Sequence, residues 1–258
     1  MKPLHFLSIS LLPLLLFSAG CAKGPAGGGG PVNNAPNRLQ VTLNLKGTLS
    51  TRAYYAVAFD DDSGREGPKA IVSGSRQSDA ITPLNGVASG SFRFIVVYSP
   101  EGFTTYRRPD PSSPNQEIIE RSNLPFVSGR LPVASANAIS FTLDLDARDS
   151  SGNFYFTHDA SGRFAPTQLK INAFATTRPF RNPDERIKPV DALGGAPALT
   201  STPETFQVGG TRRATLNDDF GAVDRNFFDA SFDNTSDPDY VNFSQLDIRT
   251  LDLVVTRG

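Results

Sequence analysis

The chain has 258 residues, of which 38% are hydrophobic and 20% are charged, and it contains 22 glycines and 20 prolines. The apolar content is that of a globular protein and excludes disorder throughout, while the glycine and proline content indicates many turns. With 25 basic and 26 acidic side chains the net charge is -1, so no overall field would attract the chain to nucleic acid or to an anionic membrane surface.

Two scarce residue types limit the chemistry that the chain can carry. Cys21 is the only cysteine, which excludes an intramolecular disulfide and a thiolate metal cluster. The histidines are His5 and His158, and His5 lies in the N-terminal leader, so one imidazole remains for acid–base or metal chemistry once the leader is removed. The sequence therefore predicts no catalytic residues.

The first residues have the features of a signal peptide. Lys2 supplies a positive charge, and the apolar run from Leu4 to Phe17 is too short to span a bilayer, which needs roughly 20 residues. The next four residues, 18–21, read Ser-Ala-Gly-Cys. This motif resembles the lipobox of bacterial lipoproteins, although Ser18 stands where that family usually has Leu. The alternative is ordinary secretion, with cleavage near Gly20 or Ala22.

The lipoprotein resemblance implies that Cys21 receives a diacylglyceryl group and becomes the lipidated N-terminus of the mature protein. Because Ala22 rather than Asp follows the cysteine, the resemblance also implies an outer-membrane location in a bacterium with two membranes. Residues 22–37 are rich in Gly, Pro and Asn and predict a flexible tether with a root-mean-square span of about 20 Å. The expected parts are a signal peptide over 1–20, the lipidated cysteine and tether over 21–37, and a single β-rich domain over 38–258.

The predicted elements after the tether are strands. Residues 39–45 alternate apolar and polar side chains, with the period of two that buries one face of a strand. The runs 53–59 and 92–98 are continuously apolar, which is typical of strands buried on both faces. Alternation returns at 139–145 and 169–173, which we expect to be buried on one face. A split into two domains near residue 180 is the alternative to a single domain.

The last predicted strand contains a change of phase. Leu246 and Ile248 alternate in one phase, whereas the apolar run 251–255 alternates in the other, and one extra residue in a β-bulge would produce this shift. We expect the run itself to be buried on both faces. No stretch has a helical apolar period, and turn-forming clusters separate the strands. The sequence predicts an all-β antiparallel sandwich, or barrel-like sandwich, with long Pro/Gly-rich loops over 107–116 and 177–203.

Acidic residues crowd between Asn217 and Asp239, where seven aspartates accompany a single arginine, Arg225. Within this segment, Asp233, Asp237 and Asp239 offer oxygen ligands at a spacing that suits Ca²⁺. The alternative is a solvated acidic loop in which aspartates form turns and caps. No other cofactor is predicted.

Residues 60–66 form a second acidic segment, whose Asp-x-Asp-x-Gly-x-Glu spacing partly resembles that of Ca²⁺-binding loops. The alternative for these residues is a strand over 53–59 that ends in an Asp/Gly hairpin turn. The sequence favours the turn.

Two further groups of residues suggest binding or catalysis. Tyr106, Arg107 and Arg108 are predicted to lie exposed in the proline-rich loop, where an aromatic face could stack on a sugar ring; the alternative is a plain surface loop. His158, Asp159 and Ser161 are the residue types of a hydrolase triad, but neighbouring strand residues point to opposite faces and the chain has no Gly-x-Ser-x-Gly motif.

The leading hypothesis is a non-enzymatic, lipid-anchored protein of the cell envelope. Its β domain would be an interaction or structural module, with the membrane as one partner through the N-terminal lipid and a protein or glycan as another. The first alternative is a carbohydrate-binding module. The second is a divergent hydrolase that uses His158 or a pair of aspartates, which would require a cleft that gathers those side chains.

Overall fold

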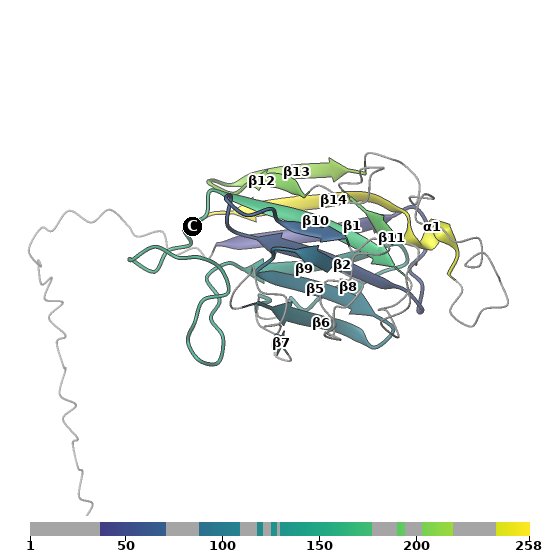
Figure 1. Cartoon of the computed structure of the whole chain (residues 1–258), viewed down its shortest axis with the longest axis horizontal. Coiled ribbons are helices and arrows are strands. Elements are labelled where there is room, and N and C mark those ends of the chain that lie inside the picture. Colours follow the sequence, from purple (N-terminus) through teal and green to yellow (C-terminus); the bar gives the residue numbers. More distant parts are fainter. Residues whose placement is uncertain are drawn as a thin grey trace, which may run out of the picture. The chain divides into compact units, whose positions relative to one another are not determined.

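The computed structural model describes residues 37–70, 88–108, 118–120, 125–127, 130–176, 190–193, 203–218 and 241–258. In this part of the chain the regular structure is almost entirely β, and every strand pair is antiparallel (Figure 1). The exception is α1 (Phe243–Leu246), a single helical turn. The predicted all-β antiparallel sandwich is confirmed.

The first sheet has five strands. In spatial order they are β13 (Arg212–Asn217), β14 (Ile248–Thr256), β1 (Arg38–Leu45), β9 (Ala138–Asp144) and β8 (Val133–Ala134). The pairing places Leu43 of β1 opposite Leu251 on one side and Ile139 on the other. Alternate residues of β1 therefore point into the core, as its sequence predicts.

The predicted bulge is present in β14. Asn44 pairs with Thr250, whereas the next residue, Leu45, pairs with Ile248, so Arg249 is the extra residue. The burial of β14 differs from the prediction, because buried residues alternate with half-buried ones instead of filling both faces. The strand is central in its sheet, but Asp252 and Val254 lie on the outer face and are only half-buried.

The second sheet lies against the first and has seven strands. Six follow the order β11 (Val190–Ala192), β10 (Gln168–Thr176), β2 (Tyr54–Asp60), β5 (Phe94–Ser99), β6 (Gly102–Arg107) and β7 (Ile118–Glu120), and β12 (Glu204–Gln207) also pairs with β10. Strand β11 corrects the prediction of an irregular loop over 177–203. Its three residues were too few to give a period in the sequence.

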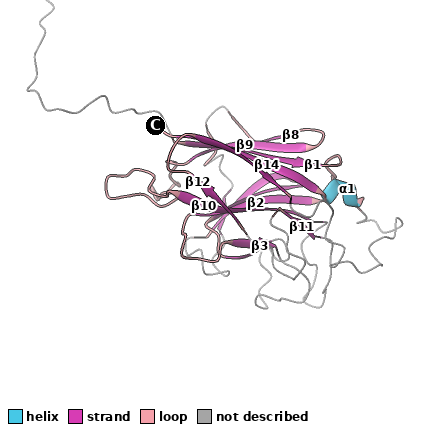
Figure 2. Cartoon of the chain, turned by 90° about the horizontal axis from the view of Figure 1, so that it is seen from above, coloured by secondary structure: helices cyan, strands magenta, loops and turns pink. Residues whose placement is uncertain are grey.

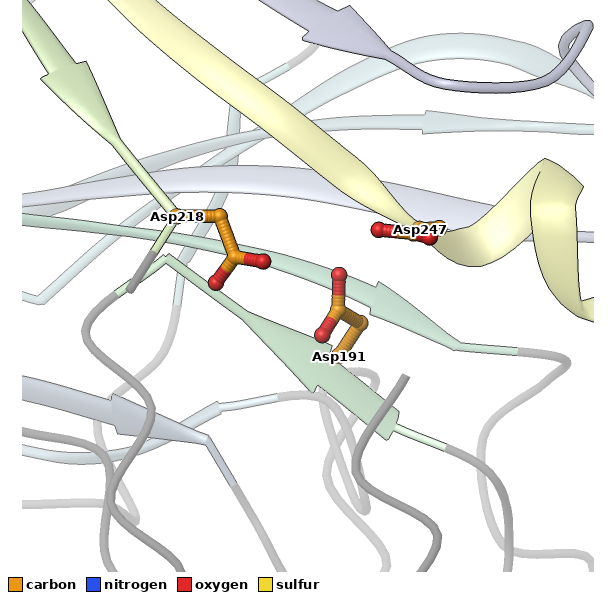
Figure 3. Close-up of side chains that lie close together, drawn as sticks. All are labelled: Asp191, Asp218 and Asp247. Carbon is orange, nitrogen blue, oxygen red and sulfur yellow. The ribbon is translucent and has the colours of Figure 1, made fainter. Parts of the chain in front are cut away.

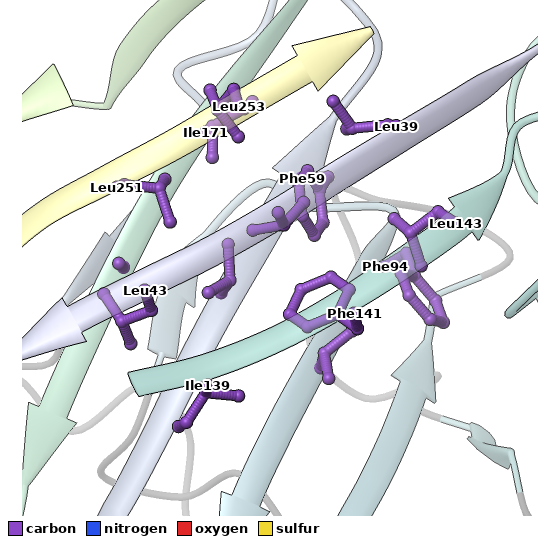
Figure 4. Close-up of a cluster of buried hydrophobic side chains, with 14 of the residues drawn as sticks. Leu39, Leu43, Phe59, Phe94, Ile139, Phe141, Leu143, Ile171, Leu251 and Leu253 are labelled. Carbon is purple, nitrogen blue, oxygen red and sulfur yellow. The ribbon is translucent and has the colours of Figure 1, made fainter. Parts of the chain in front are cut away.

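The main core fills the space between the two sheets. Figure 4 shows Phe59 and Phe94 of the second sheet among Phe141, Ile139 and leucines of the first. The rings of Phe59 and Phe141 meet edge to face with centroids 6.4 Å apart, a favourable arrangement for aromatic pairs. The sheets are thus joined by direct contacts between buried side chains.

A second apolar cluster covers the outer face of the second sheet. It contains Ala58, Ile95 and Phe174, and the small pair β3 (Pro68–Ala70) and β4 (Ala88–Gly90) contributes Ala88. In Figure 2, β3 lies beyond β2 and β10, on the side away from β9, β1 and β14. Strands β2 and β5 are therefore buried on both faces as predicted. The prediction of one buried face was wrong for β10, because this second cluster also covers it.

Tyr55 connects β2 to the segment that contains α1. Its side chain is buried, and the hydroxyl accepts a hydrogen bond from the Ser50 amide at 2.8 Å and donates one to the Gln245 carbonyl at 2.9 Å. Burial raises the pKa of Tyr55 from its ordinary value of 10.0 to about 12. The neutral phenol is the form that this site accommodates.

The described residues belong to one compact unit. The predicted signal peptide, Cys21 and residues 22–36 of the predicted tether lie outside the described residues. Among the residues that are described, no helix is both long enough and apolar enough to cross a membrane.

Candidate functional site

Tyr106 and Arg107 lie on strand β6, which corrects their predicted position in an exposed loop. Tyr106 is half-buried and packs against the outer apolar cluster. Arg107 forms an ion pair with Asp149, with 2.8 Å between Nη2 and Oδ2, and its guanidinium lies 5.6 Å from the centre of the Tyr155 ring. The two side chains therefore do not form one exposed platform.

Arg108 directly follows β6 and is 2% exposed. Its guanidinium lies over the Phe92 ring, 3.6 Å from the ring centre, and donates a hydrogen bond to the Gly90 carbonyl at 2.9 Å. Burial of this arginine is possible because the ring face and the carbonyl replace water around the charge. Arg108 thus holds the β4 end against β6 and is not an exposed ligand contact.

The predicted acidic segment at 60–66 forms a turn that is held by arginines. Asp60 is fully buried and accepts hydrogen bonds from Arg65, the shortest being 2.7 Å from Nη2. The carboxylate of Asp62 accepts a bond from the Gly64 amide at 2.8 Å. The turn does not close a hairpin, because the sheet neighbours of β2 are β10 and β5. These contacts support the turn interpretation over a Ca²⁺ loop.

Asp61 connects three segments that are distant in the sequence. One oxygen accepts a hydrogen bond from Arg93 Nε at 2.9 Å and lies 3.5 Å from Arg65 Nη2, and the other accepts the backbone N–H of Thr157. The Asp61 side chain has no exposed surface, whereas the two arginines keep about a fifth of theirs. A buried carboxylate thus orients two cationic side chains at the protein surface.

These arginines line a surface cleft of about 360 Å³. The rest of the lining comes from the turn after β2 and from the segment that leads into β10, including Thr157, Thr167 and Gln168. We call this feature the Arg93 cleft. Its volume falls at the lower end of the range found for small-molecule sites.

His158 does not form a triad with Asp159 and Ser161. Its Nε2 lies 3.2 Å from Asp146 Oδ1, and its ring stacks on Phe154 with 3.5 Å between the centres. Asp159 instead accepts a hydrogen bond from the Ser161 hydroxyl at 2.6 Å. The three side chains therefore belong to two separate groups of contacts.

Asp159 belongs to the second of two similar turns, 149–154 and 159–164, which share the pattern Asp-x-Ser-Gly-x-Phe. In each turn one oxygen of the aspartate accepts the backbone N–H groups two and four residues later. The Ser161 hydroxyl, together with backbone N–H groups, lowers the pKa of Asp159. Desolvation raises the pKa of Asp149, but N–H donors of Asn153 and Ser151 outweigh it and lower the pKa overall. Both aspartates are thus used to close turns.

Three aspartates converge at the end of the sandwich near α1 (Figure 3). Asp191 comes from β11, Asp218 follows β13, and Asp247 precedes β14. Each contributes one carboxylate oxygen to a group whose members lie within 4.8 Å of one another. We call these residues the aspartate triad. Asp218 belongs to the predicted acidic segment, whereas Asp233, Asp237 and Asp239 lie outside the described residues.

Contacts from neighbouring groups reduce the repulsion within the aspartate triad. The buried Asp191 accepts a hydrogen bond from the Ile248 amide at 2.6 Å, and Lys46 Nζ lies 2.9 Å from Asp247 Oδ1. Three carboxylate oxygens at this separation are half of the six that a calcium ion needs at minimum, so the triad could hold a hard cation only with further ligands. No spacing in the sequence indicates this group, because its members lie 27 or more residues apart.

Comparisons of the chain with protein-family models, with curated proteins and with solved structures find no match.

Proposed function

We propose that this chain is a lipid-anchored protein of the bacterial cell envelope that displays a non-enzymatic β-sandwich domain for interaction or structure. The observation that carries the proposal is the position of Cys21, the only cysteine, directly after Ser-Ala-Gly and an apolar leader. A Gly/Pro/Asn-rich stretch then separates this cysteine from β1. Such a stretch would let the sandwich stand clear of the lipid headgroups.

The contacts around His158 support a non-enzymatic domain. A nucleophile and its base must lie within hydrogen-bond reach of each other. The Nδ1 atom of His158 contacts the Phe156 carbonyl and its Nε2 contacts Asp146, whereas the Ser161 hydroxyl donates to Asp159, so His158 and Ser161 are not paired. In the aspartate triad, Asp191 accepts the Ile248 amide and so holds the start of β14. Such contacts are expected of side chains that stabilise the fold, and they support the proposal of a non-enzymatic domain.

The lipid anchor is tested by metabolic labelling of a bacterial host with an alkyne-bearing palmitate analogue. We expect the full chain to be labelled and membrane-bound, and the variant Cys21→Ser to lose both properties while it remains folded. The matched control Ala22→Ser keeps the cysteine and should be labelled normally. Labelling of Cys21→Ser, or an unlabelled parent chain, would contradict the proposal.

The membrane that carries the protein is tested in a host with two membranes by density fractionation. We expect the parent chain in the outer-membrane fraction and the variant Ala22→Asp in the inner-membrane fraction, because the residue after the cysteine directs sorting in the lipoproteins that this motif resembles. Equal distribution of both forms would contradict the outer-membrane assignment while leaving lipidation intact.

A further inference from the structure

The Arg93 cleft contains a guanidinium that is held in place and has unused donors. Arg93 Nε is bonded to the buried Asp61, and its backbone N–H donates to the Phe59 carbonyl at 2.8 Å. Among the described residues, Nη1 and Nη2 of Arg93 have no hydrogen-bond partner. Because Asp61 is itself held by Thr157, the fork of N–H donors keeps one orientation toward the cleft, which is the preorganisation that ligand sites require.

The remaining lining mixes donors with acceptors. The exposed side chains of Ser63, Thr157 and Thr167 offer hydroxyl groups, and Gln168 offers an amide. Asp62, whose side chain is 49% exposed, offers a carboxylate acceptor. The cleft therefore presents hydrogen-bond donors beside acceptors.

The charges that line the cleft cancel. The two arginines of the lining, Arg65 and Arg93, balance its two aspartates, Asp61 and Asp62. Asp60 pairs with Arg65 but is fully buried and is not part of the lining. An anion near Arg93 would be repelled by these carboxylates, and a cation would be repelled by the guanidiniums. For a charged ligand, this repulsion offsets the electrostatic attraction to the groups of opposite charge. A hydroxyl group both donates and accepts and can use both kinds of partner.

We propose that the Arg93 cleft binds a neutral, hydroxyl-rich ligand, namely a segment of uncharged polysaccharide. Ala165 and Pro166 also line the cleft, and the exposed methyl of Ala165 gives a small apolar surface that a sugar ring can lie against. This site replaces the sugar platform that the sequence placed at Tyr106. The proposal concerns the sandwich alone and does not require the lipid anchor.

The test measures binding by the purified full chain in a zwitterionic detergent, which avoids detergents with sugar headgroups. The probes are three neutral hexasaccharides, built from α-linked glucose, β-linked glucose and N-acetylglucosamine, and two charged ones, built from galacturonate and glucosamine. Titration calorimetry and saturation-transfer NMR report binding. We expect at least one neutral probe to saturate with a Kd on the order of 1 mM or below, and charged probes to bind at least about tenfold more weakly.

Two variants assign the binding to the cleft. Thr167→Phe fills the cleft from an exposed position whose backbone contact to Val208 is kept. Arg93→Lys keeps a charge for Asp61 but removes the fork of donors. Both should weaken binding at least about tenfold, whereas Thr256→Phe, the same change at an exposed site on β14, should leave the Kd within about twofold.

Three results would overturn the proposal. They are the lack of saturation by every neutral probe up to about 10 mM, tighter binding of a charged probe, and unchanged binding by Thr167→Phe. If Arg93→Lys loses stability, Thr167→Phe still decides the question, because Thr167 lies at the surface. All of these measurements use purified protein, so a failure of the lipid proposal would leave them valid.

Discussion

Asp61 has a buried carboxylate that links distant segments of the chain. Its two oxygens accept hydrogen bonds from Arg93 and Thr157, which lie 32 and 96 residues away in the sequence. Asp62, the next residue, has half of its side chain in water, and among the described residues this side chain bonds only to Gly64 and Arg65 of its own turn. We therefore expect these two neighbouring aspartates to contribute very differently to the free energy of unfolding.

Replacement of Asp61 by Ala should lower the free energy of unfolding by about 2–3 kcal/mol, because it leaves buried donors and a guanidinium without their partner. Asp62→Ala is the matched control and should cost about 1 kcal/mol or less, as exposed ion pairs do. Urea unfolding followed by circular dichroism measures both. An equal decrease in the free energy of unfolding of both variants would show that the buried hydrogen bonds of Asp61 add no more stability than the exposed contacts of Asp62.

Tyr55 makes the stability depend on alkaline pH. Its folded pKa of about 12 lies above the ordinary value of 10.0, so the neutral form is favoured by folding. This contribution is fully present below pH 10 and is lost as the pH rises from 10 toward 12. A displacement of about two pKa units corresponds to about 2–3 kcal/mol.

Tyr55→Phe should therefore have two effects. At pH 8 the variant should be about 1–2 kcal/mol less stable, because the Ser50 amide and the Gln245 carbonyl lose their partner. Between pH 10 and 12 it should lose less stability than the parent chain, because the titrating phenol is gone. Parallel pH profiles of the two proteins, measured by chemical unfolding, would contradict the buried-phenol account.

At the scale of elements, the two Asp-x-Ser-Gly turns are stabilised by hydrogen bonds from backbone N–H groups to the aspartate carboxylate. A disulfide is not possible in a chain with one cysteine. In both turns a glycine adopts a positive φ, 85° at Gly152 and 76° at Gly162, where side chains with a Cβ are strained. The residues that end the turns, Phe154 and Phe164, both contact the His158 ring. The repeat therefore places two aromatic rings around one imidazole.

Gly152→Ala isolates this backbone strain, because a Cβ at residue 152 would meet no atom within 4 Å. The variant should be about 1 kcal/mol less stable. Gly210→Ala is the matched control, since Gly210 has equal space and no positive φ, and it should be neutral or slightly stabilising. Differential scanning calorimetry compares the two, and equal melting temperatures would contradict the strain argument.

Elements with a clear period could be predicted from the sequence, and those without one could not. The alternation at 39–45 gives β1, and the change of phase before Leu251 gives the bulge at Arg249. The outer burial of β10 could not be predicted, because it depends on residues of the outer cluster that are far away in the chain. Strand β11 has three residues, fewer than a period needs.

At the scale of the whole molecule, a shared core makes the sheets depend on each other. Phe141 of the first sheet contacts Phe59 of the second and also Phe126. Both sheets lose contacts when this ring is removed, so we expect them to unfold together.

Phe141→Ala should lower the free energy of unfolding by about 3–5 kcal/mol. The near-ultraviolet and far-ultraviolet circular dichroism signals should still change in a single transition, because the same core serves both sheets. Val254→Ala, at a half-buried position on the outer face of β14, should cost about 1 kcal/mol or less. Two separate transitions in either variant would mean that the sheets are stable independently.

The candidate sites were less predictable than the fold, because they depend on contacts between residues that are far apart in the sequence. The Arg93 cleft and the aspartate triad each combine residues of an acidic segment that the sequence singled out with residues of segments that it did not, such as Ser91 to Phe94. Local patterns correctly favoured a turn at residues 60–66, but they gave no sign that Arg93 would meet Asp61. At Tyr106, prolines downstream suggested a loop where β6 still continues.

The first and last described residues are hydrogen-bonded to each other. The Gly258 amide donates to the Asn37 side chain at 3.3 Å, and Arg38 pairs with Thr256 across β1 and β14. A short linker could therefore join residue 258 to residue 37, and new ends could be opened at the exposed Gly152. Such a circularly permuted chain would keep every strand pair of the sandwich and attach the lipid tether to a different place on it.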